Sequence, residues 1–495
     1  MIDNARIAKN TVYLYIRMIF VLGANFFAVR VLLEALGVDD YGLFNLIVGF
    51  VTLFTLLNGA LQSTVQRFLC FELGKDKGGD TKAVFAVCLL LFAALAGVIL
   101  LASETIGLWF VNHKLNIPAS RSHSAAVVYQ LSILVMLAKT MQIPYTALIV
   151  SYERMNVFAK ISIVEAVLTL GAALALKFIV GDRLIWYTSL YTLATLIVVA
   201  VYAGFCRVNF PEARFPRQIE RGRIKAIGAF FSWSIFGAVA NMLKQQGLNV
   251  LLNLFFGVAF NATWALSNKV GMAVNQLVSN FQQAFQPQII KLWAKKDKTP
   301  YYDLLSSASK FSFYLLFVCS LPLICFTEFF LSTWLKGVLP PQVALFVRLT
   351  IVFSLVEALA APFWTGIQAT GKIAIYQISV SGLIASVFFG GWLMFAFEFS
   401  AWWVMALNIC VSISCHVYRI VHLKIVTGFP LERYLMRSMF PVALVSFACA
   451  VMAIKAPLLA CFACPIVVFV IGVSKQERCI VISAIRKWLA KVKEV

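Results

Sequence analysis

Long apolar stretches recur along almost the whole chain, and short polar connections separate them. A helix needs about 20 mostly apolar residues to cross the hydrocarbon core of a bilayer. Stretches that meet this rule cover residues 10–33, 42–66, 83–111, 124–150, 156–179, 184–206, 227–256, 261–290, 308–335, 343–369, 373–397, 402–426, 435–456 and 458–474. The pattern therefore predicts an all-α polytopic membrane protein with about 14 transmembrane helices.

The composition agrees with this fold class. Of the 495 residues, 61% are hydrophobic and 13% are charged, against roughly 45–50% and 25% in an ordinary soluble domain. The first apolar stretch has full spanning length and contains Arg17, so it is expected to be a retained helix and not a cleavable signal. The 11 Cys lie mostly singly in apolar runs, and neither a zinc motif nor a redox motif is expected from them.

The basic residues are distributed unevenly over the two sides that the spans define. The N-terminus, the even-numbered connections and the C-terminal tail hold 28 of the 42 Lys and Arg residues, whereas the odd-numbered connections hold six. By the positive-inside rule, both termini are expected in the cytoplasm. This bias explains most of the net charge of +21 without a nucleic-acid partner. The basic, amphipathic tail 475–495 is expected to lie as a helix on the cytoplasmic membrane surface, with docking to a protein as the alternative.

An internal repeat divides the chain. At an offset of 220 residues, Gly37-Val38 aligns with Gly257-Val258, and at an offset of 218 Pro144 aligns with Pro362. Near an offset of 224, SETIGLWF aligns with TEFFLSTWL. Two six-helix lobes in the same orientation are therefore predicted, an arrangement found in transporters. The expected boundaries are an N-lobe at 1–206, a basic linker at 207–225, a C-lobe at 226–427, two further spans in 428–474, and the tail.

Several segments resemble a known family. The run FAVRVLLEALGVDDYGLFNLIVGF, followed by LNGALQSTVQRF and a Gly-Lys turn, resembles the opening of the polysaccharide flippases. These belong to the multidrug/oligosaccharidyl-lipid/polysaccharide (MOP) exporter superfamily, which includes the MATE transporters. The segments YERMNVFAKIS and ATGKIAIYQIS look like the recurring cytoplasmic turns of that family after spans 4 and 10. The resemblance covers nearly the whole chain and is more specific for the superfamily than for the substrate.

Some basic residues fall inside the predicted spans. Arg67, Lys310 and Arg348 lie near span ends and are expected to extend to the headgroups. Arg17, Lys139 and Lys244 lie deeper, and Lys269 lies in the outer half of its span. Because a charge near the midplane costs at least about 2.5 kcal/mol, such residues normally face a cavity or a charged partner. The candidate carboxylate partners at similar depth are Glu165 and Glu357.

Polar side chains also form stripes on three predicted helices. At helical spacing, the stripe members chosen as candidate binding residues are Gln62, Asn241, Gln245, Asn249, Asn275 and Gln282. Two explanations are open, hydrogen bonds between helices or a hydrated cavity between the lobes. The lysines favour the cavity, and pairing of some lysines with the carboxylates is the alternative. A positive, amide-lined cavity suits a diphosphate that carries sugars.

The predicted function combines these residues with the family resemblance. The resemblance implies a flippase that moves undecaprenyl-diphosphate-linked oligosaccharide across the bacterial inner membrane by alternating access. Membrane potential could drive this export, and Glu165 or Glu357 could couple it to H⁺ or Na⁺. No cofactor is expected. The expected partners are the lipid-linked substrate, membrane lipids and polysaccharide assembly proteins, and the resemblance favours a monomer.

Two other functions remain open from the sequence. A multidrug antiporter of the same superfamily would share the fold, but a pocket for cationic drugs should be acidic. An integral-membrane glycosyltransferase or polysaccharide polymerase needs sizeable outer loops, whereas the longest odd-numbered connection, VNHKLNIPASRSH, is about a dozen residues long. No catalytic constellation is apparent in the sequence, so the chain is expected not to be an enzyme.

Overall fold

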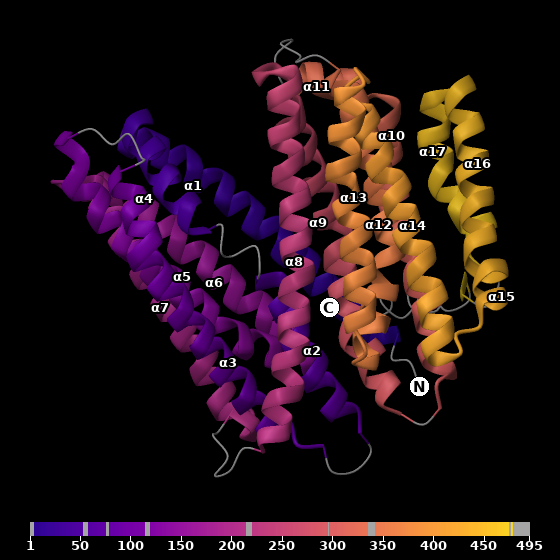
Figure 1. Cartoon of the computed structure of the whole chain (residues 1–495), viewed down its shortest axis with the longest axis horizontal. Helices are drawn as coiled ribbons and strands as arrows, with labels where there is room; N and C mark the ends of the chain where they lie inside the picture. Colours follow the sequence, from indigo (N-terminus) through magenta and orange to yellow (C-terminus); the bar gives the residue numbers. More distant parts are fainter. Residues whose placement is uncertain are drawn as a thin grey trace, which may run out of the picture. The chain divides into compact units, whose positions relative to one another are not determined.

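The computed structural model describes residues 4–52, 58–75, 79–113, 119–213, 220–295, 297–334, 342–474 and 477–478. The chain divides into two compact units, which are described separately (Figure 1). The N-terminal unit comprises residues 9–238, and the C-terminal unit comprises residues 239–495 together with residues 1–8. The boundary falls inside a long helix, 13 residues beyond the start of the C-lobe that the sequence suggested.

Helices make up the N-terminal unit. They are α1 (Asn4–Thr52), α2 (Asn58–Gly74), α3 (Thr81–Ala102), α4 (Leu108–His113), α5 (Ser122–Ser151), α6 (Met155–Ala175), α7 (Arg183–Asn209) and the first half of α8 (Arg221–Phe256). A π-helical turn, Ser103–Gly107, joins α3 to α4. Helix α5 is central, since it packs against α2, α3, α6 and α7.

The C-terminal unit begins with the second half of α8. It continues with α9 (Val258–Ala294), α10 (Thr299–Cys325), α11 (Thr327–Trp334), α12 (Val343–Thr370), α13 (Ala374–Ala396), α14 (Trp403–Thr427), α15 (Leu431–Tyr434), α16 (Phe440–Lys455) and α17 (Pro457–Val467). Helix α12 occupies the central place that α5 has in the other unit, because it packs against α9, α10 and α14. Helices α16 and α17 form a hairpin, and α17 contacts α10.

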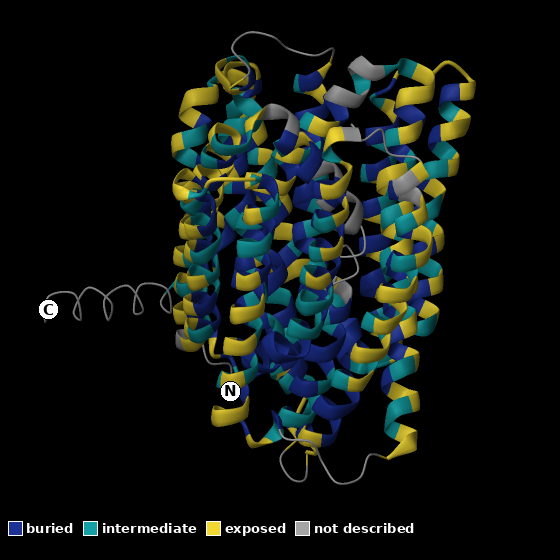
Figure 2. Ribbon diagram, turned by 90° about the vertical axis from the view of Figure 1, so that its left-hand side faces the viewer, coloured by how far each residue is buried: buried dark blue, intermediate teal, exposed yellow. Residues whose placement is uncertain are grey.

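The helices confirm the predicted fold class. Among the described residues, 11 helices are long and apolar enough to cross a membrane. The other three predicted spans correspond to the end of α1 with α2, to the more polar α9, and to α17 with the turn that follows it. Large apolar side chains on the outer helices are exposed, including Phe447 at 70% and Phe462 at 78%, and Figure 2 shows such exposed positions along the helices. Lipid would cover these faces, so the chain is a multi-pass membrane protein.

Ion pairs join connections that the topology places on one side. Arg121, in the third connection, bonds to Asp40 at 2.6 Å and to Asp182 at 3.1 Å, and these carboxylates belong to the first and fifth connections. Asp182 also caps α7 and accepts a bond from the Ser124 hydroxyl. Burial alone would raise the pKa of Asp182, but these hydrogen bonds and the Arg121 charge hold it below the ordinary value. The odd-numbered connections of this unit therefore meet, as alternating spans require.

Two glycines mark the same point of the internal repeat. Gly37 has φ 78° and ψ 174°, and Gly257 has φ 78° and ψ −172°. Only glycine adopts this backbone region readily, because a Cβ atom would clash with the backbone. The aligned sequence positions thus share an uncommon conformation. The aligned prolines Pro144 and Pro362 likewise lie inside the two central helices, α5 and α12.

Replacing Gly257 by alanine is expected to lower the free energy of unfolding by about 1–3 kcal/mol, because alanine would be forced into the glycine-only region. Thermal unfolding of the purified protein in detergent measures this loss. Gly382→Ala is the matched control, since Gly382 lies within α13 and has open space around it. A Gly257→Ala variant as stable as the control would contradict the backbone argument.

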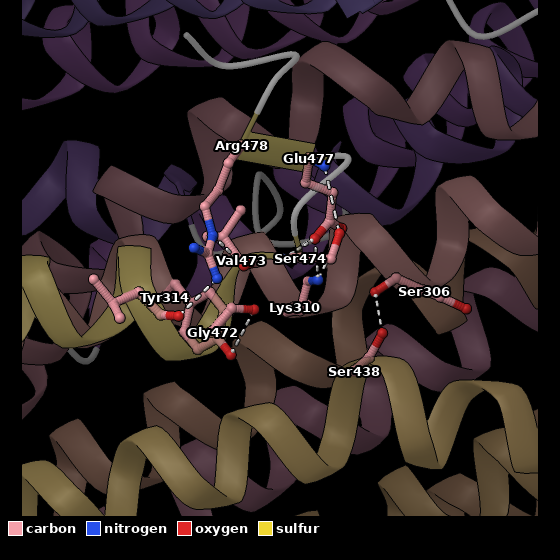
Figure 3. A network of polar contacts seen from close by, with 10 residues as sticks. Ser306, Lys310, Tyr314, Ser438, Gly472, Val473, Ser474, Glu477 and Arg478 are labelled. Carbon is pink, nitrogen blue, oxygen red and sulfur yellow. Dashed lines mark hydrogen bonds and ion pairs between the residues drawn. The ribbon is translucent and has the colours of Figure 1, made fainter.

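A buried ion pair joins Glu477, which follows α17, to helix α10 of the C-terminal unit. Lys310 of α10 is only 3% exposed, and its ammonium donates to both carboxylate oxygens of Glu477, at 2.8 and 2.7 Å (Figure 3). The expectation that Lys310 extends to the headgroups was therefore wrong. It was also wrong for Arg67, which is buried and lies over the rings of Phe68 and Phe71. In both cases a partner inside the protein replaces the headgroups.

Glu477 also forms the start of a helical turn. Its backbone N–H bonds to the Ser474 hydroxyl, and its carboxylate accepts from the Ser474 N–H at 2.8 Å. This reciprocal pattern is a capping box. The neighbouring Arg478 donates to the carbonyls of Val470 and Val473, at 2.7 and 2.8 Å. Most of the predicted surface helix, residues 479–495, lies outside the described residues.

Candidate functional site

Two deep cations and one carboxylate meet in the N-terminal unit. Lys139 of α5 forms an ion pair with Glu165 of α6, and their side chains are 26% and 30% exposed. Arg17 of α1 lies over the Phe158 ring, with its guanidinium carbon 4.6 Å from the ring centroid, and its charge interacts with Glu165 and Tyr202. These residues form the N-cluster, defined by Arg17, Lys139 and Glu165. The sequence left open that some of the deep lysines pair with carboxylates, and Lys139 does so.

A second set of charges meets in the C-terminal unit. Lys244 of α8 donates to the amide oxygen of Asn408 on α14 at 3.3 Å. Its ammonium also lies 5.1 Å from the centroid of the Phe353 ring. The Lys244 charge interacts with Glu357 of α12 and with Arg419 of α14. We call Lys244, Glu357 and Arg419 the C-cluster.

Glu357 has two further partners in the C-cluster. Its Oε1 accepts from the Ser412 hydroxyl at 2.5 Å, and its Oε2 lies 3.7 Å from Nη1 of Arg419. Arg419 also donates from Nε to the Tyr376 hydroxyl at 2.8 Å. The Glu357 side chain is 36% exposed and that of Arg419 is 11% exposed. Glu357 is therefore the more accessible member of the pair. The hydrogen bond to Tyr376 holds the Arg419 guanidinium in its more buried position.

The repeat relates one residue of the N-cluster to one residue of the C-cluster, and these two residues have opposite charge. Lys139 stands five residues before Pro144, and Glu357 stands five residues before Pro362. A cation in α5 thus corresponds to a carboxylate in α12. Each cluster nevertheless contains two cations and one carboxylate, so each carries one surplus positive charge.

Two of the predicted binding residues instead join helices. The amide of Asn275 donates to the Ser354 hydroxyl at 3.0 Å, and the amide of Gln282 donates to the Ala358 carbonyl at 3.4 Å. Both bonds connect α9 to α12, the most closely packed helices of the unit. Hydrogen bonding between helices was one of the two explanations for the polar stripes. Their positions explain why α9 is polar enough to resemble a cavity-lining helix.

The remaining predicted residues lie outside the two clusters. Asn241, Gln245 and Lys269 are exposed, whereas Gln62 and Asn249 are partly buried. Within the described C-terminal unit, Lys269 is on α9 and not among the partners of Glu357. Their role in binding stays a prediction.

Arg419 was missed as a site residue. The sequence analysis gave it no role, although it lies inside α14, eight residues before the C-terminal end of the helix. A signal was present, because Asn408, Ser412, Cys415 and Arg419 recur at helical spacing and form a polar stripe on this helix. The polar stripes predicted in spans 2, 7 and 8 therefore have a fourth counterpart in α14.

Comparison with known proteins identifies the fold. The sequence matches no protein-family model and no curated protein. A MOP superfamily transporter from Pyrococcus furiosus superposes with a TM-score of 0.69 at 11% identity. The match covers 86% of this chain and 98% of that one. That transporter is described as having a binding pocket of reverse polarity, which suggests a different function. The chain has the fold of MOP transporters.

Two MATE structures support the same conclusion. A MATE in complex with MaD3S has a TM-score of 0.69 at 12% identity, and covers 85% of this chain and 96% of its own. A multidrug resistance MATE family transporter in an outward-facing conformation has a TM-score of 0.66 at 11% identity, with 86% and 99% covered. Identities this low establish the fold and leave the substrate open.

Proposed function

We propose that this MOP-fold protein is a flippase for undecaprenyl-diphosphate-linked oligosaccharide in the bacterial inner membrane, with both termini in the cytoplasm and alternating access as its mechanism. The observation that supports this function most strongly is the surplus positive charge of each cluster. A charge is costly at membrane depth unless a partner or a substrate compensates it. An anionic substrate bound at a cluster would compensate the surplus charge of that cluster.

The chemistry of the clusters suits a diphosphate. Arg and Lys bind phosphate oxygens through charge-assisted hydrogen bonds, which are shorter and stronger than neutral ones. Lys139 and Lys244 are both partly exposed. Exposed amides such as Asn241 and Gln245 offer the donors and acceptors that sugar hydroxyls need. Recognition of the polyprenyl tail would fall to the lipid-facing surface.

The multidrug antiporter is the second candidate, because the MATE structures share its fold. The charge of the clusters disfavours it, since a cationic drug would meet two cations for each carboxylate. The Pyrococcus furiosus relative is a precedent in this fold for a pocket whose polarity suggests a different function. Drug resistance that is unchanged when the gene is deleted would further disfavour the antiporter.

Replacing Lys244 by glutamine is expected to reduce flipping roughly tenfold or more, because a hydrogen bond to a charged group contributes about 1.5–3 kcal/mol. The measurement is flipping of a fluorescent polyprenyl-diphosphate oligosaccharide in proteoliposomes. Lys372→Gln is the matched control, since Lys372 is exposed in a turn. Lys269→Gln in parallel tests whether that exposed lysine belongs to the site.

The outcomes separate the proposals. If a folded Lys244→Gln protein flips at the unmodified rate, the C-cluster does not hold the diphosphate. If the unmodified protein flips no such lipid but exports a cationic drug from the same vesicles, the flippase proposal fails and the antiporter replaces it. Gel filtration and thermal unfolding of each variant exclude loss of the fold as the cause.

A further inference from the structure

Arg419 has donor capacity that its neighbours do not use. Its Nε is satisfied by Tyr376, but its Nη1 is buried and forms no hydrogen bond with any described residue. The nearest carboxylate oxygen, Oε2 of Glu357, is 3.7 Å away, beyond hydrogen-bonding distance. A buried donor left unsatisfied costs about 1–3 kcal/mol. A ligand oxyanion at this point would recover that energy.

His416 lies one helical turn before Arg419 and shows the same feature. It is 5% exposed, and neither of its ring nitrogens forms a hydrogen bond among the described residues. Its ring packs edge-on against Phe363, with 5.5 Å between the ring centroids. Two polar side chains one turn apart on α14 are therefore largely buried and have unused hydrogen-bonding capacity.

The Glu357 carboxylate lies next to the unused donor of Arg419. It is more exposed than Arg419, and its Oε2 faces the guanidinium without hydrogen-bonding to it, while Ser412 holds its other oxygen. A carboxylate in this position presents to Arg419 the kind of group that an anionic ligand would present. Lys244 contributes a second positive charge nearby.

We infer that Arg419, supported by Tyr376, is an oxyanion subsite of the C-terminal unit and that Glu357 is its exchangeable counter-ion. A substrate oxyanion replaces the Glu357 carboxylate on Nη1 when it binds, and the carboxylate returns when the substrate leaves. Binding is thereby strong enough to select an anion and weak enough to permit release, as transport requires. This inference rests on the proposed function and adds the residue that recognises the anion.

The oxyanion has two sources in such a substrate. One is the diphosphate of the lipid, and the other is the carboxylate of an acidic sugar. Both offer paired oxygens that match a guanidinium. Soluble probes distinguish them, namely inorganic pyrophosphate for the first source and glucuronate for the second.

The test is isothermal titration of the full-length protein, in nanodiscs of zwitterionic lipid, with each probe. Glu357→Gln is expected to tighten binding of one probe about tenfold, because it removes a competing negative charge within about 4 Å of the subsite. Glu328→Gln is the matched control. Glu328 is 3.4 Å from Arg348 in the same unit, but this pair is exposed and outside the C-cluster. It should leave both affinities unchanged.

A second variant assigns the gain to Arg419. The double variant Glu357→Gln/Arg419→Gln should bind no more tightly than the unmodified protein, and removing both members of a buried pair is usually tolerated by the fold. Adding Tyr376→Phe to Glu357→Gln should lose part of the gain in affinity, because Nε of Arg419 then loses its hydrogen-bond acceptor. A gain with pyrophosphate alone assigns the diphosphate, and a gain with glucuronate alone assigns an acidic sugar.

The inference is overturned if Glu357→Gln tightens neither probe, or if the gain persists in the double variant. Because soluble anions are titrated without transport, these results are independent of the flipping assay. Binding that follows the expected pattern in a protein that flips no lipid-linked oligosaccharide would retain the subsite and reject the proposed function.

Discussion

Replacement of Glu477 by alanine is expected to lower the free energy of unfolding by about 3 kcal/mol or more. Lys310 is 3% exposed and Glu477 is 21% exposed, so the change leaves a buried ammonium without its carboxylate. The alanine also removes one half of the capping box with Ser474. Thermal unfolding in detergent, followed by circular dichroism, should show a midpoint several degrees lower.

A double-mutant cycle tests whether the ion pair is the cause. Lys310→Met removes the buried charge and keeps a long side chain, so Lys310→Met/Glu477→Ala should recover most of the lost stability. Glu34→Ala is the control, because Glu34 pairs with Arg30 on α1 and the two side chains are 53% and 75% exposed. It should cost about 1 kcal/mol or less. Equal losses for Glu34→Ala and Glu477→Ala would contradict the argument from burial.

The same pair predicts how stability depends on pH. Burial alone would raise the pKa of Glu477, but hydrogen bonds from Lys310 and Ser474 and the Lys310 charge hold it below its usual value of 4.5. Because the folded pKa is the lower one, the stabilisation is fully present above pH 4.5. It is lost as the pH falls through the folded value. The stability difference from Glu477→Gln should therefore be largest near pH 7 and shrink in acid.

The spans could be predicted because their signal is local. A membrane helix needs about 20 apolar residues in sequence, and nearly every predicted stretch coincides with a helix. The largest error was at α10, which begins at Thr299 and ends at Cys325, whereas the prediction ran from 308 to 335. Its first turns are polar and gave no membrane signal, and the helix ends before Phe326, after which α11 begins.

The charge partners could not be predicted, because they come from distant positions. Lys310 and Glu477 are 167 residues apart, and Lys244 and Asn408 are 164 apart. Sequence depth identified Lys139 and Glu165 as unusual, but only helix packing shows that they pair. Arg419 was overlooked because its partners, Tyr376 and Glu357, lie on other helices. The repeat predicted the related prolines and glycines, and the offset that aligns the prolines also aligns Lys139 with Glu357.

These pairings affect which energy source is proposed for transport. Glu165 and Glu357 were candidate coupling sites for H⁺ or Na⁺, and each has a cationic partner, Lys139 and Arg419 respectively. A carboxylate that already compensates a cation is a poorer site for a second cation. The membrane potential can act without such a site, because it acts directly on the charge of the substrate. We therefore propose the potential as the principal driving force.

An inside-negative potential is expected to favour outward movement of the diphosphate by about 2.3 kcal/mol per charge at 100 mV, or roughly fifty-fold per charge in its distribution. Proteoliposomes with an imposed potassium diffusion potential measure this, and reversing its sign should reverse the direction of net flipping. A polyprenyl-monophosphate substrate is the control, since its smaller charge should give a shallower dependence. Glu165→Gln and Glu357→Gln should leave the dependence on potential unchanged. The distribution of the lipid between the leaflets could instead be the same for both signs of the potential. That result would mean that a cation crosses with the substrate and cancels its charge, and the potential alone would no longer explain export.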